Sequence, residues 1–317
     1  MKDYPSNERH QKADTRQKFY QQAAPPSGLV PHIACIILNW NGWQDTVDCL
    51  DALQHCTYSS FSVIVVDNGS TDDSVARIRT AHRHILLLQS RENLGFAGGN
   101  NIGIRHALVH GADYVWLLNN DTQPAPEALS ALVAKALTDS RIGAVASICY
   151  YAEAPATVQV WAGTRVNLWI GTAVNTSEPR DDDWFHALYG ASLLLSRAAL
   201  DDVGLLDQGF FLYWEETEFC LRLRKRGWRL AAASASHVLH KVNASIGGNK
   251  VVMDRYSTAS ALRVLRLHSP APHLASFLFL VARFGRRISR LEFTRCKSVW
   301  AGVRDYCRSL PVVPAIR

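Results

Sequence analysis

Three glutamates stand beside an apolar and aromatic run in the last third of the chain. Glu215, Glu216 and Glu218 follow the segment FFLYW (210–214) within four positions. If the segment that they open is a helix, the first two lie in its first turn, where the helix dipole favours negative charge. A carboxylate that apolar walls deprive of water has a raised pKa, which makes it a usable general base near neutral pH. We therefore expect proton-transfer chemistry at this turn, whereas Glu218 is expected to pair with Arg222 one helical turn further on.

A second group of candidates combines oxygen ligands at a strand end. Asp121 follows a buried apolar run and lies among Asn119, Asn120 and Thr122. Magnesium usually takes only one or two protein carboxylates and keeps phosphate and water oxygens as its other ligands. The pattern therefore predicts a divalent cation that bridges two phosphates at this position. His240 precedes the small polar loop KVNASIGG, and the residues alone leave a metal or phosphate role and a structural role open for it.

Asp67 stands at another strand end, where its carboxylate can accept hydrogen bonds from a ribose or a base. Capping of an Asx turn is the alternative, and the residues alone leave both open. The glycines of NLGFAGGNNIG (93–103) do not have the G-x-G-x-x-G spacing after the first strand, which excludes a Rossmann dehydrogenase. Gly98 and Gly99 are expected instead to let the backbone approach a ligand closely and to open a helix whose amides meet an anion.

Apolar runs that alternate with helical patterns predict the scaffold for these residues. HIACIILNW (32–40), SVIVVDNGS (62–70) and YVWLLNND (114–121) are typical of buried parallel strands, and the segments between them have helical spacing. This alternation predicts a doubly wound, mostly parallel α/β sheet, in which ligands bind at the carboxyl ends of the strands. All three ends are small and polar. They are Asn39-Trp40-Asn41, Asp67-Asn68-Gly69-Ser70 and Asn119-Asn120-Asp121. Each alone is typical of a turn, but their coincidence at one edge predicts a ligand floor.

The pattern along the chain also predicts its organisation. Residues 1–30 lack the apolar stretch of a secretory signal and are expected to form a flexible tail. After residue 125 the pattern changes to short strands, and no Pro/Gly/Ser-rich linker separates this α+β half from the first. We therefore predict one catalytic domain over residues 31–250, with halves at 31–125 and 126–250, and a helical C-terminal segment over residues 251–317.

Composition and charge limit the class of protein. Of 317 residues, 48% are hydrophobic and 20% are charged, which indicates a globular chain. The net charge is +6, and basic residues gather in the last third, which favours an anionic partner near the C-terminus. The seven cysteines include no C-x-x-C pair, so we expect a reducing cytoplasm and no structural zinc.

The C-terminal segment mixes Leu, Phe and Trp with many arginines, as helices on an anionic membrane surface do. Its longest apolar stretch, HLASFLFLVARF (273–284), is too short to span a bilayer, which needs about 20 apolar residues. Helices packed on the catalytic domain, with solvated arginines, are the alternative. The first of these two interpretations predicts peripheral attachment at the inner face of the cytoplasmic membrane.

Seven stretches, taken in order from about residue 32 to 245, resemble the inverting family 2 glycosyltransferases of GT-A fold, nearest their rhamnosyltransferase-like branch. They are IILNWNG, VVDNGSTD, NLGFAGGNNIGIRHAL, LLNNDT, GASLLLSRAAL, VGLLDQGFFLYWEETEFCLRLRKRGW and HVLHKVNAS. Any one alone is a weak signal, and together they are a strong one.

The resemblance implies an inverting displacement on a nucleotide-diphospho-sugar with Mg²⁺ or Mn²⁺ as cofactor. LLNNDT takes the place of the family's D-x-D metal motif, so Asp121 matches its last aspartate and Asn119 its first. WEETEF stands where the family commonly has Glu-Asp-x-Asp, so Glu216 matches the catalytic base and is one methylene longer. His240 matches a histidine that joins the metal site.

The resemblance also divides the catalytic domain into a nucleotide-sugar half (31–125) and an acceptor half (126–250). The expected nucleotide-sugar contacts are Asn39, Trp40, Asn41, Asp67, Asn68, Ser70, Asn93, Gly98, Gly99, Asn100, Asn119 and Asn120, and the expected acceptor contacts are Gly190, Ala191, Trp214 and Glu215.

The function predicted in this way is sugar transfer to a glycan or lipid-linked acceptor in bacterial cell-surface polysaccharide synthesis, without a nucleic-acid partner. Rhamnose is the family-level expectation for the sugar, and galactofuranose or another hexose stays open. The alternative is a catalytically silent module of the same fold that binds nucleotide sugar or glycan. A nucleotidyltransferase is excluded because NWNGWQD lacks a Gly-rich, basic loop after the first strand. The decisive expectation is geometric: Glu216 must face a cation on Asp121 across one shallow cleft.

Overall fold

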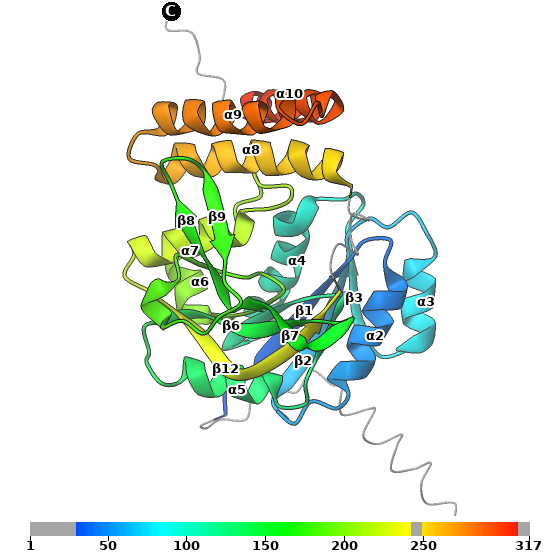
Figure 1. Cartoon of the computed structure of the whole chain (residues 1–317). Helices are drawn as coiled ribbons and strands as arrows, with labels where there is room; N and C mark the ends of the chain where they lie inside the picture. Colours follow the sequence, from blue (N-terminus) through cyan, green and yellow to red (C-terminus); the bar gives the residue numbers. More distant parts are fainter. Residues whose placement is uncertain (1–29, 242–248, 310–317) are drawn as a thin grey trace, which may run out of the picture.

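The computed structural model describes residues 30–241 and 249–309 (Figure 1). The predicted tail therefore lies outside the described residues except for Val30, and so does most of the loop after His240. Within the described ranges a nine-stranded mixed sheet forms the centre of the molecule, in the order β3-β2-β1-β4-β11-β6-β12-β5, with β7 paired to β6. Its strands are β1 (Ile33–Asn39), β2 (Phe61–Asp67), β3 (Leu86–Gln89), β4 (Tyr114–Asn119), β5 (Thr122–Pro124), β6 (Ile142–Tyr151), β7 (Ala154–Trp161), β11 (Ser192–Ser196) and β12 (Arg229–His240).

The predicted parallel strands form one half of this sheet. Strands β3, β2, β1 and β4 are all parallel, and β6 is parallel to β12. Strand β11 lies antiparallel between β4 and β6, and therefore joins the two halves into one sheet without a linker. The first half has the topology that the sequence predicts.

Helices cover both faces of the sheet, which explains the near-continuous apolar runs in its central strands. On β1, Ile33, Cys35 and Ile37 face one core cluster. Helices α2 (Trp43–Leu53), α3 (Ser74–Ala81) and α5 (Ala128–Ala136) contribute to this cluster. The alternate residues Ala34 and Ile36 face the other cluster. Helices α4 (Gly95–Val109), α6 (Arg197–Val203) and α7 (Glu215–Lys225) contribute to that one.

Helix α4 begins at Gly95, three residues before Gly98, which was expected to open it together with Gly99. The Asn93 side-chain oxygen accepts a hydrogen bond from the amide of Gly95 at 2.9 Å. Gly95 itself has φ +73°, a conformation that glycine adopts without a steric cost. The Asn93 side chain and one left-handed glycine therefore start the helix ahead of the predicted pair.

A second, small sheet is formed within residues 126–250. It has the order β10-β8-β9, with β8 at Gly163–Asn167, β9 at Thr172–Asn175 and β10 at Ala187–Leu188. A short 3-10 helix, η1 (Asp182–Trp184), precedes β10. Figure 1 shows the β8–β9 hairpin reaching from the body of the molecule toward the C-terminal helices.

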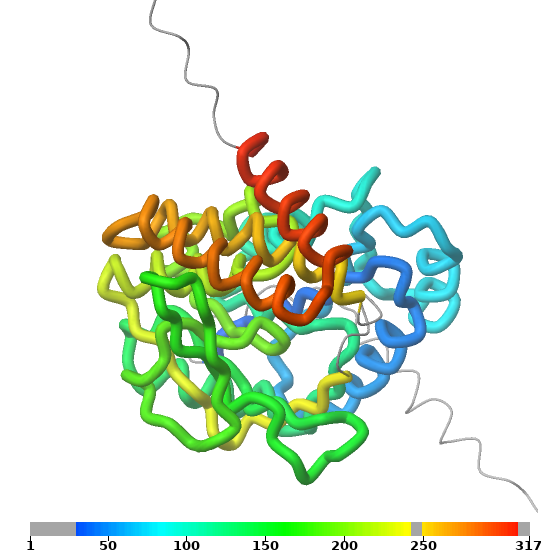
Figure 2. The backbone as a smooth tube through the Cα atoms, turned by 45° about the horizontal axis from the view of Figure 1, so that its top comes forward, coloured from blue at the N-terminus to red at the C-terminus, as the bar shows by residue number. Residues whose placement is uncertain are grey.

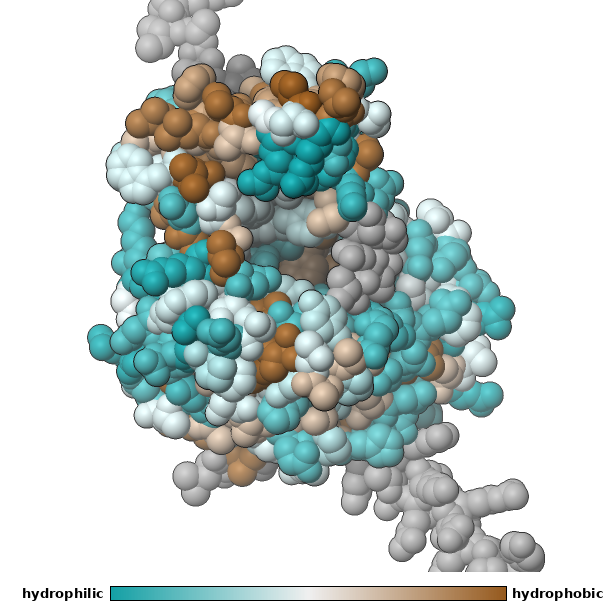
Figure 3. Space-filling model, viewed as in Figure 1, coloured by the Kyte–Doolittle hydropathy of each residue, from teal (hydrophilic) through white to brown (hydrophobic). Residues whose placement is uncertain are grey.

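Three C-terminal helices form a layer over the rest of the molecule, as both backbone views show (Figures 1 and 2). They are α8 (Lys250–His268), α9 (Pro272–Ile288) and α10 (Phe293–Ser309), so the predicted helical segment is confirmed where the structure describes it. The layer has an apolar core of its own, which includes Leu262, Leu265 and Phe279. Figure 3 shows that the surface is hollowed beneath this layer.

Candidate active site

The carboxyl ends of β1 and β2 meet at one edge of the sheet, as predicted. Asn39 and Asp67 are register partners, and the amide of Asn39 donates to a carboxylate oxygen of Asp67 at 2.9 Å. Asp67 also accepts from the hydroxyl of Ser70 at 2.6 Å and from its backbone N–H at 3.1 Å. Asp67 therefore caps a turn, which is one of the two roles that the sequence left open for it. The side-chain amide of Asn39, a fully buried residue, stabilises this turn.

Trp40 and Asn41 lie on the solvent side of this floor. The Trp40 side chain is 43% exposed, which leaves its ring free to stack on a planar ligand. Asn41 has φ 50°, and its side-chain oxygen accepts a hydrogen bond from the amide of Thr71 at 2.8 Å. The backbone N–H of Asn41 donates to Ser70 at 2.9 Å. Asn41 therefore ties the ends of β1 and β2 together.

The next group of expected donor contacts braces the turn before α4. Asn68 donates to Asn93 and to the carbonyl of Gly95, each at 3.0 Å, and accepts from Leu94 N–H. Asn100 is 2% exposed and donates to the carbonyl of Phe96 at 3.0 Å. These side chains hold the floor in place from below.

Packing within the protein requires small residues at Gly98 and Gly99, which differs from the expected reason, the close approach of a ligand. A Cβ at Gly99 would lie 2.4 Å from Cδ1 of Leu38, and one at Gly98 would lie 2.7 Å from Cβ of Leu94. Close approach is therefore needed between α4, β1 and the preceding turn of this chain. The sequence shows that small residues are required here but does not show what approaches them.

Asp121 and His240 are brought together by the pairing of β5 with β12, in which His240 is opposite Thr122. The His240 Nε2 atom lies 3.4 Å from Oδ1 of Asp121, and both side chains are buried. The other ring nitrogen, Nδ1, lies 2.8 Å from the side-chain oxygen of Gln159 on β7. An amide oxygen can only accept, so Nδ1 carries a proton, and the lone pair of Nε2 in the neutral ring faces Asp121.

This arrangement fits a divalent cation. Oδ1 of Asp121 is buried and has no hydrogen-bond partner among residues 30–241 and 249–309. Two acceptor atoms that face each other in a buried site are unfavourable unless a positive charge lies between them. No group of three or more His, Cys, Asp or Glu side chains with metal-binding geometry occurs in the described ranges. Asp121 and His240 would therefore supply two ligands, and phosphate and water oxygens would supply the others.

The two asparagines before Asp121 are placed by backbone and side-chain contacts. The amide N–H of Asn119 donates to the carbonyl of Ala191 at 2.9 Å. The Asn120 side chain donates to Gly42 O at 3.3 Å and to Thr46 Oγ1 at 3.2 Å. Asn120 thus anchors the metal turn to the start of α2, whereas Asn119 connects it to the segment of Ala191.

Glu216 lies in the first turn of α7, as predicted, and an unusual backbone places it there. Tyr213 and Trp214 have φ of 68° and 71°, so two successive bulky residues are left-handed. Such residues cost on the order of 1–3 kcal/mol each and persist only where the surrounding structure enforces them. Gly190 packs directly on the Glu216 side chain, because a Cβ there would lie 3.3 Å from Cγ of Glu216.

The electrostatics of this turn follow from burial. Loss of hydration raises the pKa of Glu216 to about 7. Burial, together with the charge of Glu216, raises the pKa of Glu215 well above its ordinary value. Oε2 of Glu215 is buried without a hydrogen-bond partner within the described part of the chain. A carboxylate with a pKa near 7 is matched to general base catalysis at neutral pH.

Tyr189 lies between Glu216 and the Asp121–His240 pair. Its ring packs edge-on against the ring of His240, with centroids 5.8 Å apart. Burial raises the pKa of Tyr189, and the charges of Cys149, Glu216 and Asp121 raise it further. Gly190, the next residue, packs against Glu216, so the two candidate groups lie in one neighbourhood.

The remaining expected acceptor residues are largely covered by protein. Ala191 is 2% exposed, and Glu215 is 3% exposed. Trp214 packs against both the core beside α7 and the core of the C-terminal layer. Gly190, the fourth of them, packs against the Glu216 side chain.

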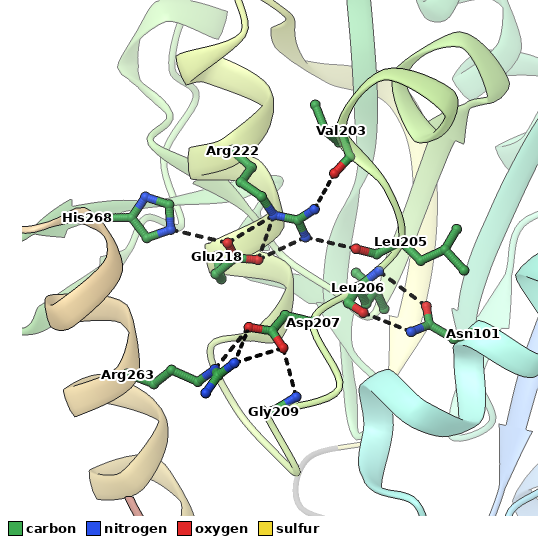
Figure 4. Close-up of polar contacts among 10 residues, drawn as sticks. All are labelled: Asn101, Val203, Leu205, Leu206, Asp207, Gly209, Glu218, Arg222, Arg263 and His268. Atoms are coloured by element: carbon green, nitrogen blue, oxygen red, sulfur yellow. Dashed lines mark hydrogen bonds and ion pairs between the residues drawn. The ribbon is translucent and has the colours of Figure 1, made fainter. Parts of the chain in front are cut away.

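Glu218 has a structural role that the sequence partly predicted (Figure 4). The Arg222 Nε donates to its carboxylate at 2.9 and 3.0 Å, and His268 of α8 lies 3.2 Å from it. Arg222 also donates to the carbonyls of Val203 and Leu205. The i,i+4 pair was expected from spacing, whereas His268 is 50 residues away and gave no signal.

Gln159 and Tyr189 are the other residues that sequence reasoning missed. Gln159 lies on β7, and Tyr189 lies just after β10, in segments whose patterns indicated only short strands. Tyr189 directly precedes the GASLLLSRAAL stretch, which is the one available signal for it.

The chain has the GT-A fold of glycosyltransferases, which confirms the predicted fold class. A solved structure of a mannosyltransferase from Pyrobaculum calidifontis, in complex with GDP-mannose and Mn²⁺, superposes with a TM-score of 0.57 at 16% identity, over 96% of this chain and 82% of the other.

The sequence comparison then defines the family. Residues 34–200 match the model of glycosyl transferase family 2, and the chain belongs to this family. A low-salt glycan biosynthesis hexosyltransferase of Haloferax volcanii is 22% identical over 67% of this chain and 68% of its own length. The N-acetylglucosaminyl-diphospho-decaprenol L-rhamnosyltransferase of Mycobacterium tuberculosis is 26% identical over 74% of this chain and 79% of its own.

Proposed function

We propose that this glycosyltransferase transfers a sugar from a nucleotide-diphospho-sugar to a hydroxyl group of a glycan or lipid-linked acceptor, with inversion at the anomeric carbon. One observation carries the proposal. Glu216, whose pKa burial raises to about 7, packs against Gly190, and the neighbouring residue in the chain, Tyr189, contacts His240 of the Asp121–His240 pair. A proton acceptor and a candidate cation site in one neighbourhood are the two groups that such a transfer needs.

Glu216 acts as the general base in this proposal. Its carboxylate takes the proton of the acceptor hydroxyl while the oxygen forms a bond to the anomeric carbon. The bond from that carbon to the diphosphate breaks in the same displacement, and the nucleoside diphosphate leaves with the electron pair. Attack from the face opposite the leaving group inverts the configuration. The extra methylene of Glu216 relative to aspartate is accommodated beside Gly190, which has no side chain.

Asp121 and His240 would hold the divalent cation, Mg²⁺ or Mn²⁺. When bound, the cation neutralises charge that develops on the leaving diphosphate. Gln159 keeps the histidine ring in the orientation and tautomer that direct Nε2 toward Asp121. The Mn²⁺ in the complex of the mannosyltransferase from P. calidifontis supports a divalent cation here.

The donor is expected at the floor formed by the ends of β1, β2 and β4, within residues 31–125. Trp40, with its exposed ring, and Asp67 are the proposed contacts to base and ribose. Asn39, Asn68, Asn93, Gly98, Gly99 and Asn100 support this floor through their contacts inside the protein. Residues 126–250 supply the acceptor side, with residues 251–317 as the C-terminal segment.

We propose rhamnose or another hexose as the sugar, and a lipid-linked intermediate of a bacterial cell-surface polysaccharide as the acceptor. The names of the hexosyl and rhamnosyl relatives support this choice. A reducing cytoplasmic location is proposed from the seven cysteines, all of which carry free thiols. No helix in residues 30–241 and 249–309 is long and apolar enough to cross a membrane.

A silent sugar-binding module is the second candidate, favoured by Asn119 in place of the first acidic residue of the metal motif. One experiment separates the two functions. A panel of sugar nucleotides is screened with Mn²⁺ for thermal stabilisation of the full chain, since a ligand of the folded state raises its melting temperature. The stabilising donor is then offered with lipid-linked and soluble acceptors, and the product linkage is read by NMR. We expect transfer with inverted configuration. Stabilisation without transfer to any acceptor would favour the silent module, and a retained configuration would exclude the displacement.

A further inference from the structure

The C-terminal layer presents an apolar face to solvent. On α9, Leu274, Phe277, Val281 and Ile288 are each more than half exposed, and their spacing of three, four and seven residues places them on one side of the helix. Phe279, on the opposite side, is buried in the core of the layer. Figure 3 shows hydrophobic side chains gathered over these helices. Exposed apolar residues scattered singly need no explanation, but a contiguous stripe indicates an interaction surface.

The tip of the β8–β9 hairpin packs against the same layer. Gly171, with φ +61°, lies so close to the layer that a Cβ there would be 2.9 Å from Phe279 and 3.0 Å from Leu265. Trp169 and Ile170, which precede it in the chain, are 53% and 40% exposed. The hairpin tip therefore adds two exposed apolar side chains next to the layer.

Helix α10 adds an alternating aromatic and basic edge. Phe293, Lys297, Trp300 and Arg304 recur every three or four residues, so they share one side of the helix, and all four are exposed. We call the exposed apolar and basic residues of α9, α10 and the hairpin tip the docking face. Its members are Trp169, Ile170, Leu274, Phe277, Leu278, Val281, Ile288, Phe293, Lys297, Trp300 and Arg304.

The basic residues of this layer fall into two groups with different roles. Between residues 266 and 308 the chain has nine Lys and Arg and two acidic residues. Arg283, Arg287 and Arg295 turn inward and bond to Asp254. The others are exposed, and they are Arg266, Arg286, Arg290, Lys297, Arg304 and Arg308. The surface excess of positive charge therefore remains after the internal ion pairs are counted.

The exposed apolar side chains and the exposed Lys and Arg of the docking face together favour one kind of binding partner. Apolar and aromatic side chains beside exposed Lys and Arg are typical of helices that lie in the interface of an anionic membrane. A second copy of the same face would bring like charges together, which opposes a symmetric dimer. We propose that the docking face binds the surface of an anionic lipid bilayer, with α9, α10 and the hairpin tip in contact with the headgroup region.

The contacts in Figure 4 fix the bilayer relative to the active site. Helix α8 lies under the docking face and bonds to the catalytic helix through His268 and Glu218. Arg263 of α8 also forms a bidentate ion pair with Asp207, in the segment before α7. These contacts attach the C-terminal layer firmly to the rest of the protein. The layer would therefore hold the active site at a fixed height above the lipid. A further consequence rests on the proposed function. At that height the hydroxyl group of a lipid-linked acceptor would reach the active site while its lipid stays in the bilayer.

Co-sedimentation of the full chain with vesicles tests the proposal. Vesicles of phosphatidylcholine alone are compared with vesicles that also contain phosphatidylglycerol. We expect the protein to pellet with the second and to stay in the supernatant with the first. The double variant Phe277→Ser/Val281→Ser should lower the partition coefficient about tenfold or more, because two exposed apolar side chains no longer insert. Lys297→Gln and Arg304→Gln should each lower it about fivefold at low salt.

A matched control uses apolar residues that are equally exposed elsewhere. Val109→Ser/Leu137→Ser changes the ends of α4 and α5 and should leave pelleting unchanged. Quenching by brominated lipid gives a second measurement. Quenching should fall in Trp169→Phe/Trp300→Phe and persist in Trp40→Phe.

Three results would overturn the proposal. They are absence of wild-type pelleting, equal pelleting of the docking-face and control variants, and a solution dimer that the Phe277→Ser/Val281→Ser change dissociates. Membrane binding is measured without donor or acceptor. Absence of membrane binding can therefore be distinguished from absence of sugar transfer.

Discussion

Two carboxylates that the protein withdraws from water have opposite electrostatics. Glu216, in the first turn of α7, lies next to the carboxyl group of Glu215, and burial raises its pKa to about 7. Burial also pushes the pKa of Asp254 upward, but hydrogen bonds from Arg287 and Arg295 and the charge of Arg283 hold it below its ordinary value. The difference lies in the partners rather than in depth. Asp254 joins three helices, whereas Glu216 is left able to exchange a proton.

The arginines around Asp254 show the cost of that arrangement. Burial, together with the neighbouring Arg287 and Arg295, lowers the pKa of Arg283 to about 10, although Asp254 opposes this. Its Nε atom is buried without a hydrogen-bond partner within the described ranges. Three guanidinium groups here face two carboxylates, because Glu292 also pairs with Arg295, and Asp254 is the one that contacts all three arginines.

The largest effect is therefore expected for Asp254→Asn. Removal of one partner from a buried ionic group leaves the others uncompensated, so we expect a loss of about 3–5 kcal/mol in the free energy of unfolding. Chemical denaturation measures this loss. Asp305→Asn, which breaks a more exposed ion pair with Arg255, is the control and should cost about 1 kcal/mol or less. Equal costs for the two variants would contradict the role of Asp254 as a hub.

Glu216→Gln is expected to change stability in the opposite direction. The folded-state pKa of about 7 lies above the unfolded value, so ionisation destabilises the fold as pH rises from the unfolded pKa to about 7. Glutamine does not ionise. At about pH 8 the variant should be more stable than wild type by about 1–3 kcal/mol, and near pH 4 the two should be equal. Thermal unfolding at both pH values measures this.

The matched control for that gain is Glu218→Gln. Glu218 lies two residues further along the same helix but pairs with Arg222 and His268. Its replacement should destabilise the fold at neutral pH. A gain in stability for both variants would mean that the contrast between partnered and unpartnered carboxylates is wrong.

The pH dependence of activity tests the same difference between Glu216 and the carboxylates that pair with cations. A general base works only when it is deprotonated, so kcat/KM should rise with pH and level off above about 7, falling about tenfold per unit below it. Initial rates across a pH series, with the fold checked by circular dichroism, provide the profile. A profile that is flat from pH 5 to 8 would place the base elsewhere.

Much of the scaffold could be predicted because its signals are local. The apolar runs of β1, β2 and β4 predicted the first half of the sheet, and the polar strand ends lie at one edge of it. The helix on which the interpretation of Glu215 and Glu216 depends is present as α7, with both residues in its first turn. The early start of α4 was missed because it depends on Asn93 and a left-handed Gly95.

The contacts that complete the candidate site could not be predicted in the same way. Gln159 reaches His240 across 81 residues of sequence, and Tyr189 comes from a short segment beside the small sheet. Neither has a spacing that indicates a partner. The role of Gly99 was misassigned because a requirement for smallness does not reveal whether a ligand or Leu38 comes close.

The most direct test of the base is the turnover number of Glu216→Gln beside that of wild type, with Mn²⁺ and the stabilising donor. Donor affinity is measured in parallel by calorimetry, which separates loss of chemistry from loss of binding. If Glu216 takes the acceptor proton, the variant should bind donor as wild type does, and its turnover should fall by about 10²–10⁴-fold. Equal turnover of the two proteins would contradict the assignment of Glu216 as the catalytic base.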